Sequence, residues 1–283
     1  MASLKPCPVV GQQARAARRP AVRVTAFVQQ TPTAAPLQTP PAVVVDPFET
    51  KLVYKDNWLE RWFIKVYTVK LADQLVGVPV PEDTTYDDFV SVSKQIMKGR
   101  TPEQQHKLVL SMLNTLLPKQ ASMVFRKLFP PTKTSAELNA FFAYLGFAWL
   151  VGEMELQTGD VQISPTEVRQ QKSIVKIKKC RYLEASGCVG LCVNMCKVPT
   201  QTFFTEGFGL PLTMKPKFED LSCEMIFGQA PQPEDVDEAF KQPCFKIHCN
   251  TAVAEPKACI KLQGPPVKAL ADPALAPAPH TSA

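Results

Sequence analysis

The sequence has no apolar run long enough to cross a bilayer, and it has no acidic residue before Asp46. A membrane-spanning helix needs about 20 consecutive apolar residues. The longest nearly apolar stretch, residues 141–151, is far shorter and suits a buried helix. We therefore expect a soluble protein, or one that touches a membrane from one side only. The sequence also lacks an internal repeat and a glycine-rich phosphate loop.

The excess of positive charge belongs to the N-terminus and not to the rest of the chain. The formal net charge is +6, and the acid-free stretch before Asp46 supplies five positive charges, from Lys5, Arg15, Arg18, Arg19 and Arg23. A nucleic-acid-binding protein needs a basic surface on its folded domain. The charge therefore gives no support to nucleic-acid binding, and we expect no nucleic-acid partner.

Residues 1–45 have the composition of an organellar targeting segment with a linker. They are arginine-rich and acid-free, and they lack the long apolar core of a secretory signal. Residues 22–26 look like the processing region of a plastid transit peptide, and the Pro-, Thr- and Ala-rich residues 29–47 suit a flexible linker. We predict a plastid protein located in the stroma. A mitochondrial address and a basic tail without an address are the alternatives.

Residues 46–152 predict a succession of amphipathic helices. A short one is expected over residues 121–128, ended by two prolines. Their aromatic stripes indicate core packing first, although a long apolar substrate would need similar walls. The expected N-terminal capping residues of the longer helices are Asp56 or Asn57, Thr85, Thr101 and Thr134.

After Gly152 the pattern changes to alternation. Residues 161–163 and 174–178 alternate as strands do and predict a small hairpin that leads into Cys180. The predicted fold class is α+β, predominantly helical, with a cysteine-rich C-terminal block.

We expect one domain over residues 46–263, helical over 46–152 and cysteine-rich and metal-binding over 153–263. The Pro- and Ala-rich residues 264–283 predict a disordered tail.

Eight of the nine cysteines lie between Cys180 and Cys259. This density is typical of a disulfide scaffold or a metal site. Plastid stroma is largely reducing, so a metal or cluster site is favoured over stable disulfides. A thiol redox protein is a further alternative, but the chain has no Cys-x-x-Cys pair to indicate one.

The centre of this block is a triplet with a spacing of four residues, formed by Cys188, Cys192 and Cys196. On an unbroken helix its outer members would lie about 12 Å apart, too far to share one metal ion. Either two neighbours share a site or the helix breaks, and Gly187 and Gly190 favour a break. Pro199 is then predicted to turn the chain, with Thr200 capping a new short helix.

The candidate ligands are thiols, and no catalytic acid or base is identified. Thiolates suit iron, iron–sulfur clusters or zinc, and the residues alone rank zinc no lower than iron. We expect His106 at the surface. His248, beside Cys249, is expected to be solvent-exposed, with metal binding as the alternative. The predicted cofactor ligands are Cys188, Cys192, Cys196 and Cys223, with Cys244 and Cys249 as further metal ligands.

The cysteine block contains three distinctive segments, residues 180–184 (CRYLE), 187–190 (GCVG) and 192–197 (CVNMCK). These segments resemble the plastid β-carotene isomerase family of the strigolactone pathway. The similarity continues through residues 199–228 and includes residues 149–152 upstream, but Lys217 stands where the family tends to have Asn.

The resemblance implies reversible isomerisation of all-trans and 9-cis β-carotene, with bound iron as non-haem iron or an iron–sulfur cluster. A carotenoid substrate dissolves in membranes, so we expect peripheral contact with plastid membranes through exposed apolar residues of the helical region. One alternative is a non-enzymatic zinc or iron–sulfur module that serves as a scaffold or assembly factor. Another is an isomerase for a different carotene or bond. The sequence makes no prediction of oligomeric state.

Overall fold

The structure is a computed structural model that describes residues 46–245 except 76, 117 and 119. The chain divides into two units, Met1–Val44 and Val45–Ala283, and every described residue belongs to the second. The predicted transit segment, His248, Cys249 and the predicted tail lie outside the described residues.

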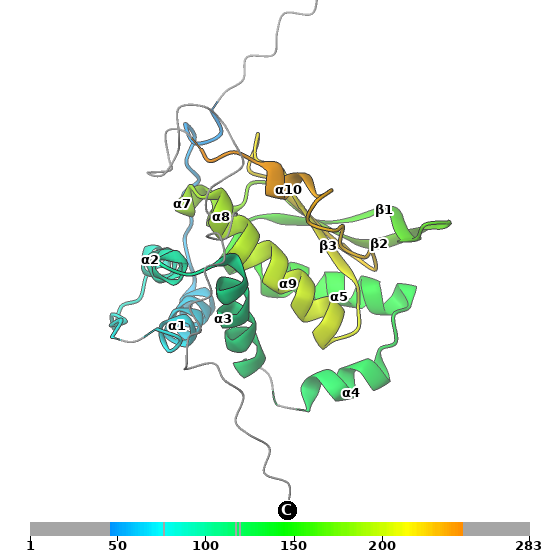
Figure 1. Ribbon diagram of the computed structural model, residues 1–283, viewed down its shortest axis with the longest axis horizontal. Coiled ribbons are helices and arrows are strands. Elements are labelled where there is room, and N and C mark those ends of the chain that lie inside the picture. Colours follow the sequence, from blue (N-terminus) through cyan, green and yellow to red (C-terminus); the bar gives the residue numbers. More distant parts are fainter. Residues whose placement is uncertain (1–45, 76, 117, 119, 246–283) are drawn as a thin grey trace, which may run out of the picture. The chain divides into compact units, whose positions relative to one another are not determined.

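The helices are α1 (Trp58–Ala72), α2 (Tyr86–Met97), α3 (Pro102–Thr115), α4 (Ala121–Leu128), α5 (Lys133–Gly146), α6 (Ala148–Val151), α7 (Arg181–Ser186), α8 (Val189–Leu191), α9 (Val198–Thr202) and α10 (Glu238–Lys241), with π-helical turns η1 (Cys192–Lys197) and η2 (Phe203–Gly207) (Figure 1). The strands are β1 (Met154–Ser164), β2 (Glu167–Ile177), β3 (Leu212–Pro216) and β4 (Cys223–Phe227).

The first three helices begin where the sequence predicts. Asn57, Thr85 and Thr101 cap α1, α2 and α3, and each closes a capping box with the residue three positions later. The reciprocal bonds satisfy backbone N–H groups that the first helical turn leaves without partners. None of the helices in the described part of the chain has the length and apolar character needed to cross a bilayer.

The predicted start of α5 is wrong by two residues, because Thr132 and not Thr134 is its cap. The hydroxyl oxygen of Thr132 accepts a hydrogen bond from the backbone N–H of Ser135 at 3.3 Å. Thr132 is the first residue after Pro130 and Pro131, and prolines are excluded from a helix interior. The helix also ends at Gly146, so the apolar stretch of residues 141–151, expected to form one buried helix, is interrupted before the short α6.

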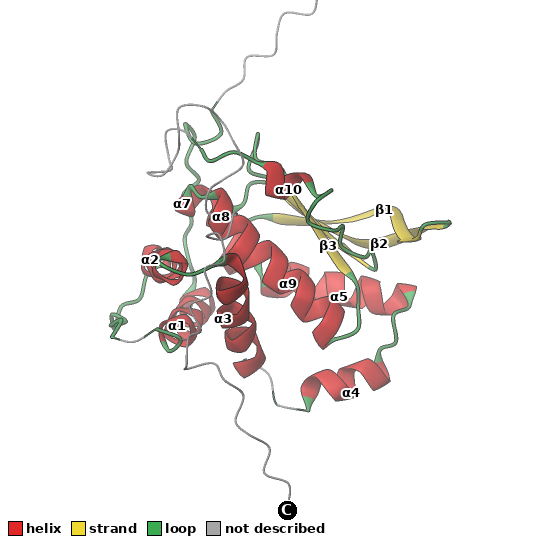
Figure 2. Ribbon diagram, in the orientation of Figure 1, coloured by secondary structure: helices red, strands yellow, loops and turns green. Residues whose placement is uncertain are grey.

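The strands form one four-stranded antiparallel sheet in the order β1-β2-β4-β3. The predicted hairpin is confirmed as β1 and β2, which are longer than the alternating segments indicated, whereas β3 and β4 were not predicted. Ser173, Val175 and Ile177 alternate along β2 and are all buried. This face of the sheet packs on helices, as Figure 2 shows. The α+β class with mostly helical content is thus confirmed.

A single helical path runs from α8 through η1 and α9 to η2. The prediction that Pro199 turns the chain and Thr200 caps a new helix is therefore wrong. Pro199 lies in the first turn of α9, directly after the wide turn η1. Because the π-helical turn already departs from regular α-helical hydrogen bonding, it accommodates a proline that would kink or break a regular helix.

The hydrophobic core lies where the helices meet the sheet, and Trp149 is one of its buried aromatic members. Its ring stacks on Phe63 with centroids 5.9 Å apart and meets Tyr67 edge-on at 4.7 Å. Phe89 approaches the same ring at 6.2 Å. Burying each large apolar side chain contributes about 1.5–3 kcal/mol, so this cluster fixes α1, α2 and α6 to one another.

Candidate active site

An apolar cavity of about 280 Å³ lies between the helices and the sheet. No charged side chain lines it among the described residues. Its aromatic walls come from α1, α2, α4, α7 and the η2 region, and methionines close it toward the sheet. The aromatic lining residues are Tyr67, Phe89, Phe125, Phe147, Tyr182, Phe203, Phe204 and Phe208, and the sulfur-bearing ones are Met112, Met195, Cys196, Met214 and Met225.

The polar side chains at the cavity wall are mostly engaged with their own helices. The Ser93 hydroxyl donates to the carbonyl of Phe89 at 2.9 Å, and the Asn139 amide donates to the carbonyl of Ser135 at 2.8 Å. Burial raises the pKa of Tyr182 well above its ordinary value, so its phenol stays neutral. A cavity of this kind selects a hydrocarbon by shape rather than by charge.

A second, much smaller cavity of about 20 Å³ adjoins the first and is surrounded by thiols. Val151, Tyr182, Cys196 and Met214 line both cavities. Cys196 therefore stands at the boundary between the apolar cavity and the group of thiols. The cysteines of this small cavity, called the cysteine cluster below, are Cys180, Cys192, Cys196 and Cys223.

Three separate elements bring the cysteine cluster together. Cys180 caps α7, and its backbone N–H donates to the carbonyl of Leu221 at 2.7 Å. Cys192 and Cys196 are the first and fifth residues of η1. Cys223 begins β4, where it pairs with Ile177 of β2. Convergence of these thiols thus depends on the sheet register as much as on the helix.

Burial dominates the electrostatics of the cysteine cluster. It raises the pKa of Cys180 to about 11 and that of Cys196 to about 12, and it raises the pKa values of Cys192 and Cys223 well above the ordinary range. The positive charge of the neighbouring Lys197 acts in the opposite direction on Cys192 and Cys223. All four side chains are therefore neutral thiols near neutral pH in this arrangement.

The structure gathers three of the predicted ligands and separates the others. Cys192, Cys196 and Cys223 belong to the cysteine cluster. Cys188 precedes α8 and Cys244 follows α10, and both are partly buried and line neither cavity. Cys249 lies outside the described residues.

Sequence reasoning missed Cys180 as a member of the site. The available signal was its position at the end of the predicted hairpin, at the head of the CRYLE segment. That position places it just after the end of β2, opposite the start of β4 where Cys223 lies.

The thiols of the cysteine cluster are suitable ligands for a soft metal, but in the described arrangement they do not form a complete metal site. Thiolate sulfur is a preferred donor for iron and zinc. Within residues 46–245, no three Cys, His, Asp or Glu side chains lie close enough together to hold a metal ion. Metal binding by this cluster would require the thiols to lose their protons and move closer together.

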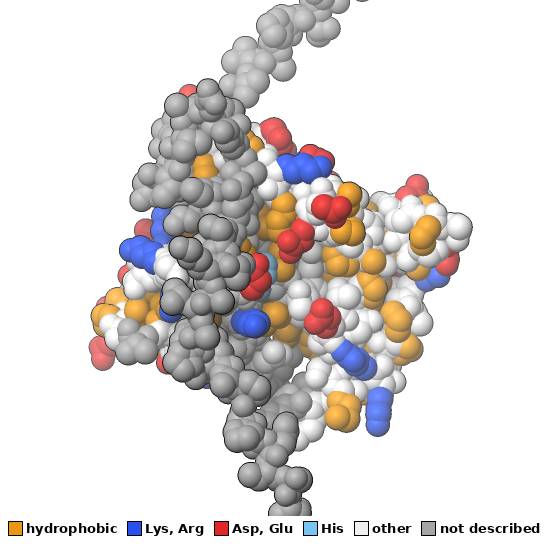
Figure 3. All heavy atoms as spheres, viewed as in Figure 1, with side chains coloured by type: hydrophobic (Ala, Val, Ile, Leu, Met, Phe, Trp, Pro, Cys, Tyr) orange, Lys and Arg blue, Asp and Glu red, His pale blue; other side chains and the backbone are white. Residues whose placement is uncertain are grey.

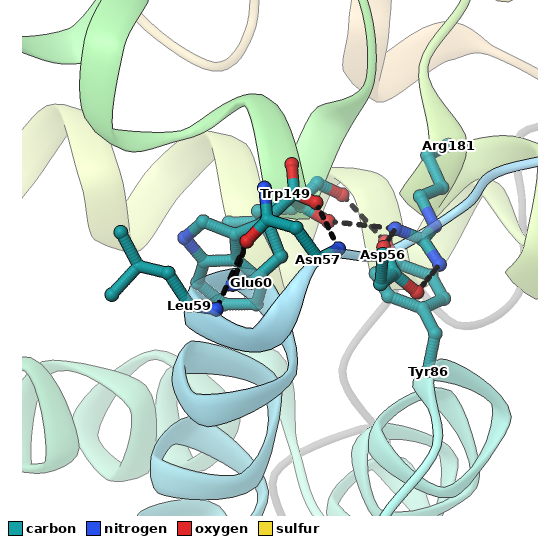
Figure 4. Close-up of polar contacts among 8 residues, drawn as sticks. Asp56, Asn57, Leu59, Glu60, Tyr86, Trp149 and Arg181 are labelled. Atoms are coloured by element: carbon teal, nitrogen blue, oxygen red, sulfur yellow. Dashed lines mark hydrogen bonds and ion pairs between the residues drawn. The ribbon is translucent and has the colours of Figure 1, made fainter.

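Arg181, the residue after Cys180, anchors α7 to three other parts of the domain (Figure 4). Its guanidinium forms a two-point ion pair with Asp56, with one N–O distance of 2.8 Å, and donates to the carbonyl of Trp149 at 3.1 Å. Its central carbon lies 3.8 Å from the ring centroid of Tyr86 and 4.5 Å from that of Tyr54. This network fixes the backbone from which Cys180 projects.

A chain of amides fixes η1 from the opposite side. The Asn194 side chain donates to the Gln105 side chain at 2.9 Å, and a ring nitrogen of His106 lies 3.3 Å from the Asn194 oxygen. The prediction that His106 is a surface residue is thus wrong, because it is half-buried against η1. The side-chain amide of the neighbouring Gln105 in turn donates a hydrogen bond to the carbonyl of Arg100.

An α+β domain with a charge-free apolar cavity beside a group of thiols has the shape and lining to accommodate an apolar molecule next to sulfur. Residues 149–236 match the family model described as "Beta-carotene isomerase D27-like, C-terminal". The chain is 38% identical over 195 residues to "Beta-carotene isomerase D27, chloroplastic" of Medicago truncatula, which covers 69% of this chain and 75% of the relative. The protein of the same name from Arabidopsis thaliana is 39% identical over 193 residues, covering 68% and 71%. The chain belongs to the β-carotene isomerase D27 family.

The resemblance seen in the cysteine block is thereby confirmed, and the match also covers the cavity residues of α6, α7 and the α8–η2 helix. Both relatives are named chloroplastic, so the predicted plastid location is confirmed. No solved structure matches the chain.

Proposed function

We propose that this protein is a carotenoid isomerase that interconverts all-trans and 9-cis β-carotene in plastids. The observation that carries the proposal is the position of Cys196, which lines the apolar cavity and the cysteine cluster together. The names of the two relatives support the substrate. We further propose that the 9-cis product supplies strigolactone and related apocarotenoid synthesis.

The chemistry of the cavity supports a polyene substrate. β-Carotene is a hydrocarbon with no group that could use a charge or a hydrogen bond, and the cavity offers aromatic rings and thioethers instead. Ligand pockets for drug-sized molecules hold about 300–1,000 Å³. A cavity of about 280 Å³ therefore takes one end of a long carotene, and the remainder extends beyond it.

The protein residues would act by positioning the polyene and excluding water. Rotation about a conjugated double bond is slow because π overlap must be lost during the turn. Rings such as Phe204 and Tyr182 can hold the two flanks of the reacting bond while the soft methionines adapt to the changing shape. No charged acid–base pair lines the cavity in the described part of the chain, and none is needed for this reaction.

Iron is the proposed cofactor, held by thiolates of the cysteine cluster with further ligands from the predicted set. When bound there, iron would supply one-electron or Lewis-acid chemistry that lowers the order of a neighbouring double bond. The first candidates are Cys192 and Cys223, which both line the small cavity. Burial raises the pKa values of these thiols and the charge of Lys197 offsets only part of that effect, so a bound metal would have to displace their protons.

The test uses the full chain purified without oxygen. Iron, zinc and sulfide are measured, and the same sample is incubated with all-trans and with 9-cis β-carotene. We expect iron and conversion in both directions. Cys192→Ala should lose both, while Ser186→Ala, a change of a buried residue of similar size on α7 that lines neither cavity, should keep them. If Cys192→Ala retains iron and full conversion, the metal-centred part of the proposal is wrong.

A second candidate is a non-enzymatic metal-binding module, which the grouping of four thiols around one small cavity favours. Such a module would bind its metal at the same cysteine cluster, but it would make no use of the apolar cavity. Zinc without iron, together with no change in either carotene isomer, would favour this module over the isomerase. Conversion of a different carotene would instead retain the isomerase and change its substrate.

A further inference from the structure

Helix α4 combines three features that occur together nowhere else among the described helices. It lines the apolar cavity through Phe125, it carries exposed apolar residues, and it lies in a long stretch without acids. No Asp or Glu occurs between Glu103 and Glu137, and this stretch includes five lysines and arginines. The basic residues are Lys107, Lys119, Arg126, Lys127 and Lys133.

The two sides of α4 differ in what they contact. Phe125 faces the domain, where its ring lies 4.6 Å from that of Phe208, and Arg126 donates to the carbonyl of Gly207 at 2.9 Å. Both contacts reach the η2 region, which itself lines the cavity. The described contacts of α4 with the rest of the domain are therefore few and concentrate on the η2 region.

The opposite side of α4 faces solvent and is apolar. Met123, Val124 and Leu128 are 61%, 50% and 67% exposed. Helical spacing places Lys127 between them on the same side, since it follows Met123 by four residues and Val124 by three. Figures 1 and 3 show α4 at one edge of the domain, with hydrophobic and basic side chains next to one another on that part of the surface.

An exposed apolar strip with an embedded lysine, in an acid-free stretch, is complementary to an anionic lipid surface. The basic groups match the anionic headgroups, and the apolar residues match the outer part of the acyl region. A protein partner would leave the role of Phe125 in the cavity wall unexplained, whereas a bilayer is where a carotene dissolves.

We infer that α4 is the membrane-docking lid of this protein. Its outer side enters the surface of an anionic bilayer, and the resulting displacement of Phe125 opens the cavity toward the lipid. This inference rests on the proposed carotenoid substrate for its purpose. The docking itself depends only on the surface of α4 and can be measured without any carotene.

Flotation with carotene-free vesicles tests the docking. Vesicles of phosphatidylcholine alone are compared with vesicles that also contain phosphatidylglycerol. We expect the full chain to float with the anionic vesicles and to be released by high salt. The variant Met123→Gln/Leu128→Gln should bind at least about tenfold more weakly, because two apolar side chains no longer enter the lipid.

Val124 and Val236 provide a matched pair, since both are 50% exposed. Val124→Gln should weaken flotation, and Val236→Gln should leave it unchanged. All of these side chains are exposed, so the variants should unfold at the same urea concentration as the parent protein. Equal flotation of the α4 variants and the parent, or no flotation of the parent, would overturn the inference. A change from dimer to monomer in the α4 variants would assign this surface to a second copy and would overturn it as well.

Activity assays separate this inference from the proposed function. The α4 double variant should convert detergent-dispersed β-carotene at the parent rate and lose at least about tenfold with carotene in anionic vesicles. If the parent floats but converts carotene in neither medium, the docking stands and the proposed isomerase function fails. If the variant loses the same activity in detergent, α4 acts in the cavity and the docking role is wrong.

Discussion

The ammonium group of Lys197 lies 2.6 Å from a carboxylate oxygen of Asp237, and both side chains are largely buried. Lys197 also donates a hydrogen bond to the carbonyl of Met214. One side chain of η1 thus connects the wall of the cysteine cluster to β3 and to the segment just before α10. A buried charge of this kind is stable only while its partner remains in place.

Removing one member of this pair should destabilise the protein strongly. Lys197→Met leaves the Asp237 carboxylate buried without its counter-ion, and we expect a loss of about 3–5 kcal/mol in the free energy of unfolding. Lys217→Met is the control, because its pair with Glu224 is exposed at 3.3 Å and should change stability by at most about 1 kcal/mol. Urea unfolding of the reduced, metal-free chains measures both. Equal losses for the two variants would contradict this interpretation.

Filling the apolar cavity should block activity without unfolding the domain. Val109 lines the cavity on α3, whereas Val92 is buried to the same extent on α2 and does not line it. Val109→Phe should reduce β-carotene isomerisation at least about tenfold and change stability by about 1 kcal/mol or less. Val92→Phe should cost about 1–3 kcal/mol through overpacking. Urea unfolding and an isomer assay by chromatography distinguish the two. Full activity of Val109→Phe would exclude this cavity as the substrate site.

The stability of the domain should decrease in mild acid because of His106. Burial lowers the pKa of His106 below its ordinary value of 6.5, against the opposing effects of Asn194, Glu234 and Glu103. The unfolded chain therefore binds the proton first as the pH falls below 6.5. The stabilising contribution of neutral His106 is present above that pH and is lost as the pH falls through the folded-state value. Unfolding free energies between about pH 7 and pH 5 should fall less steeply for His106→Gln than for the parent. Parallel curves would show that this histidine is not responsible.

Gly152 should tolerate no side chain, in contrast to Gly99. Gly152 has φ of +90°, and an added Cβ would lie 3.0 Å from the Tyr54 hydroxyl and 3.3 Å from the carbonyl of Lys179. Gly99 also has positive φ, at +70°, but an added Cβ would meet nothing within 4 Å. We expect Gly99→Ala to cost about 1–2 kcal/mol and Gly152→Ala about 3 kcal/mol or more. A smaller loss for Gly152→Ala in thermal or urea unfolding would contradict the contact argument.

The parts of the fold that the sequence predicted are those that local chemistry decides. The caps Asn57, Thr85 and Thr101 form bonds within four residues of themselves, so their signals are complete in the printed sequence. The hairpin of β1 and β2 is also local. The strands β3 and β4 are five residues each, and their pairing depends on partners elsewhere in the chain.

The candidate site was predictable in kind but not in membership. Cysteine density indicated a thiol site, and three of its members were named. Cys180 joins Cys223 because β2 and β4 pair in one particular register, which single-sequence periodicity does not reveal. The spacing argument for the central cysteines assumed either a regular helix or a break, and the structure has a wide π-helical turn instead.

The wide turn η1 accommodates one residue more than a regular α-helix would hold over the same stretch. Within a regular α-helix, removing a single residue rotates every later side chain by about 100°. At η1 the return to an α-helical turn would offset that rotation, so Phe203 and Phe204 should keep their places in the cavity wall. The same deletion would change the positions of Cys192 and Cys196 relative to each other. A one-residue deletion within residues 192–197 should therefore preserve the fold better than one within α9, while altering the cysteine cluster itself.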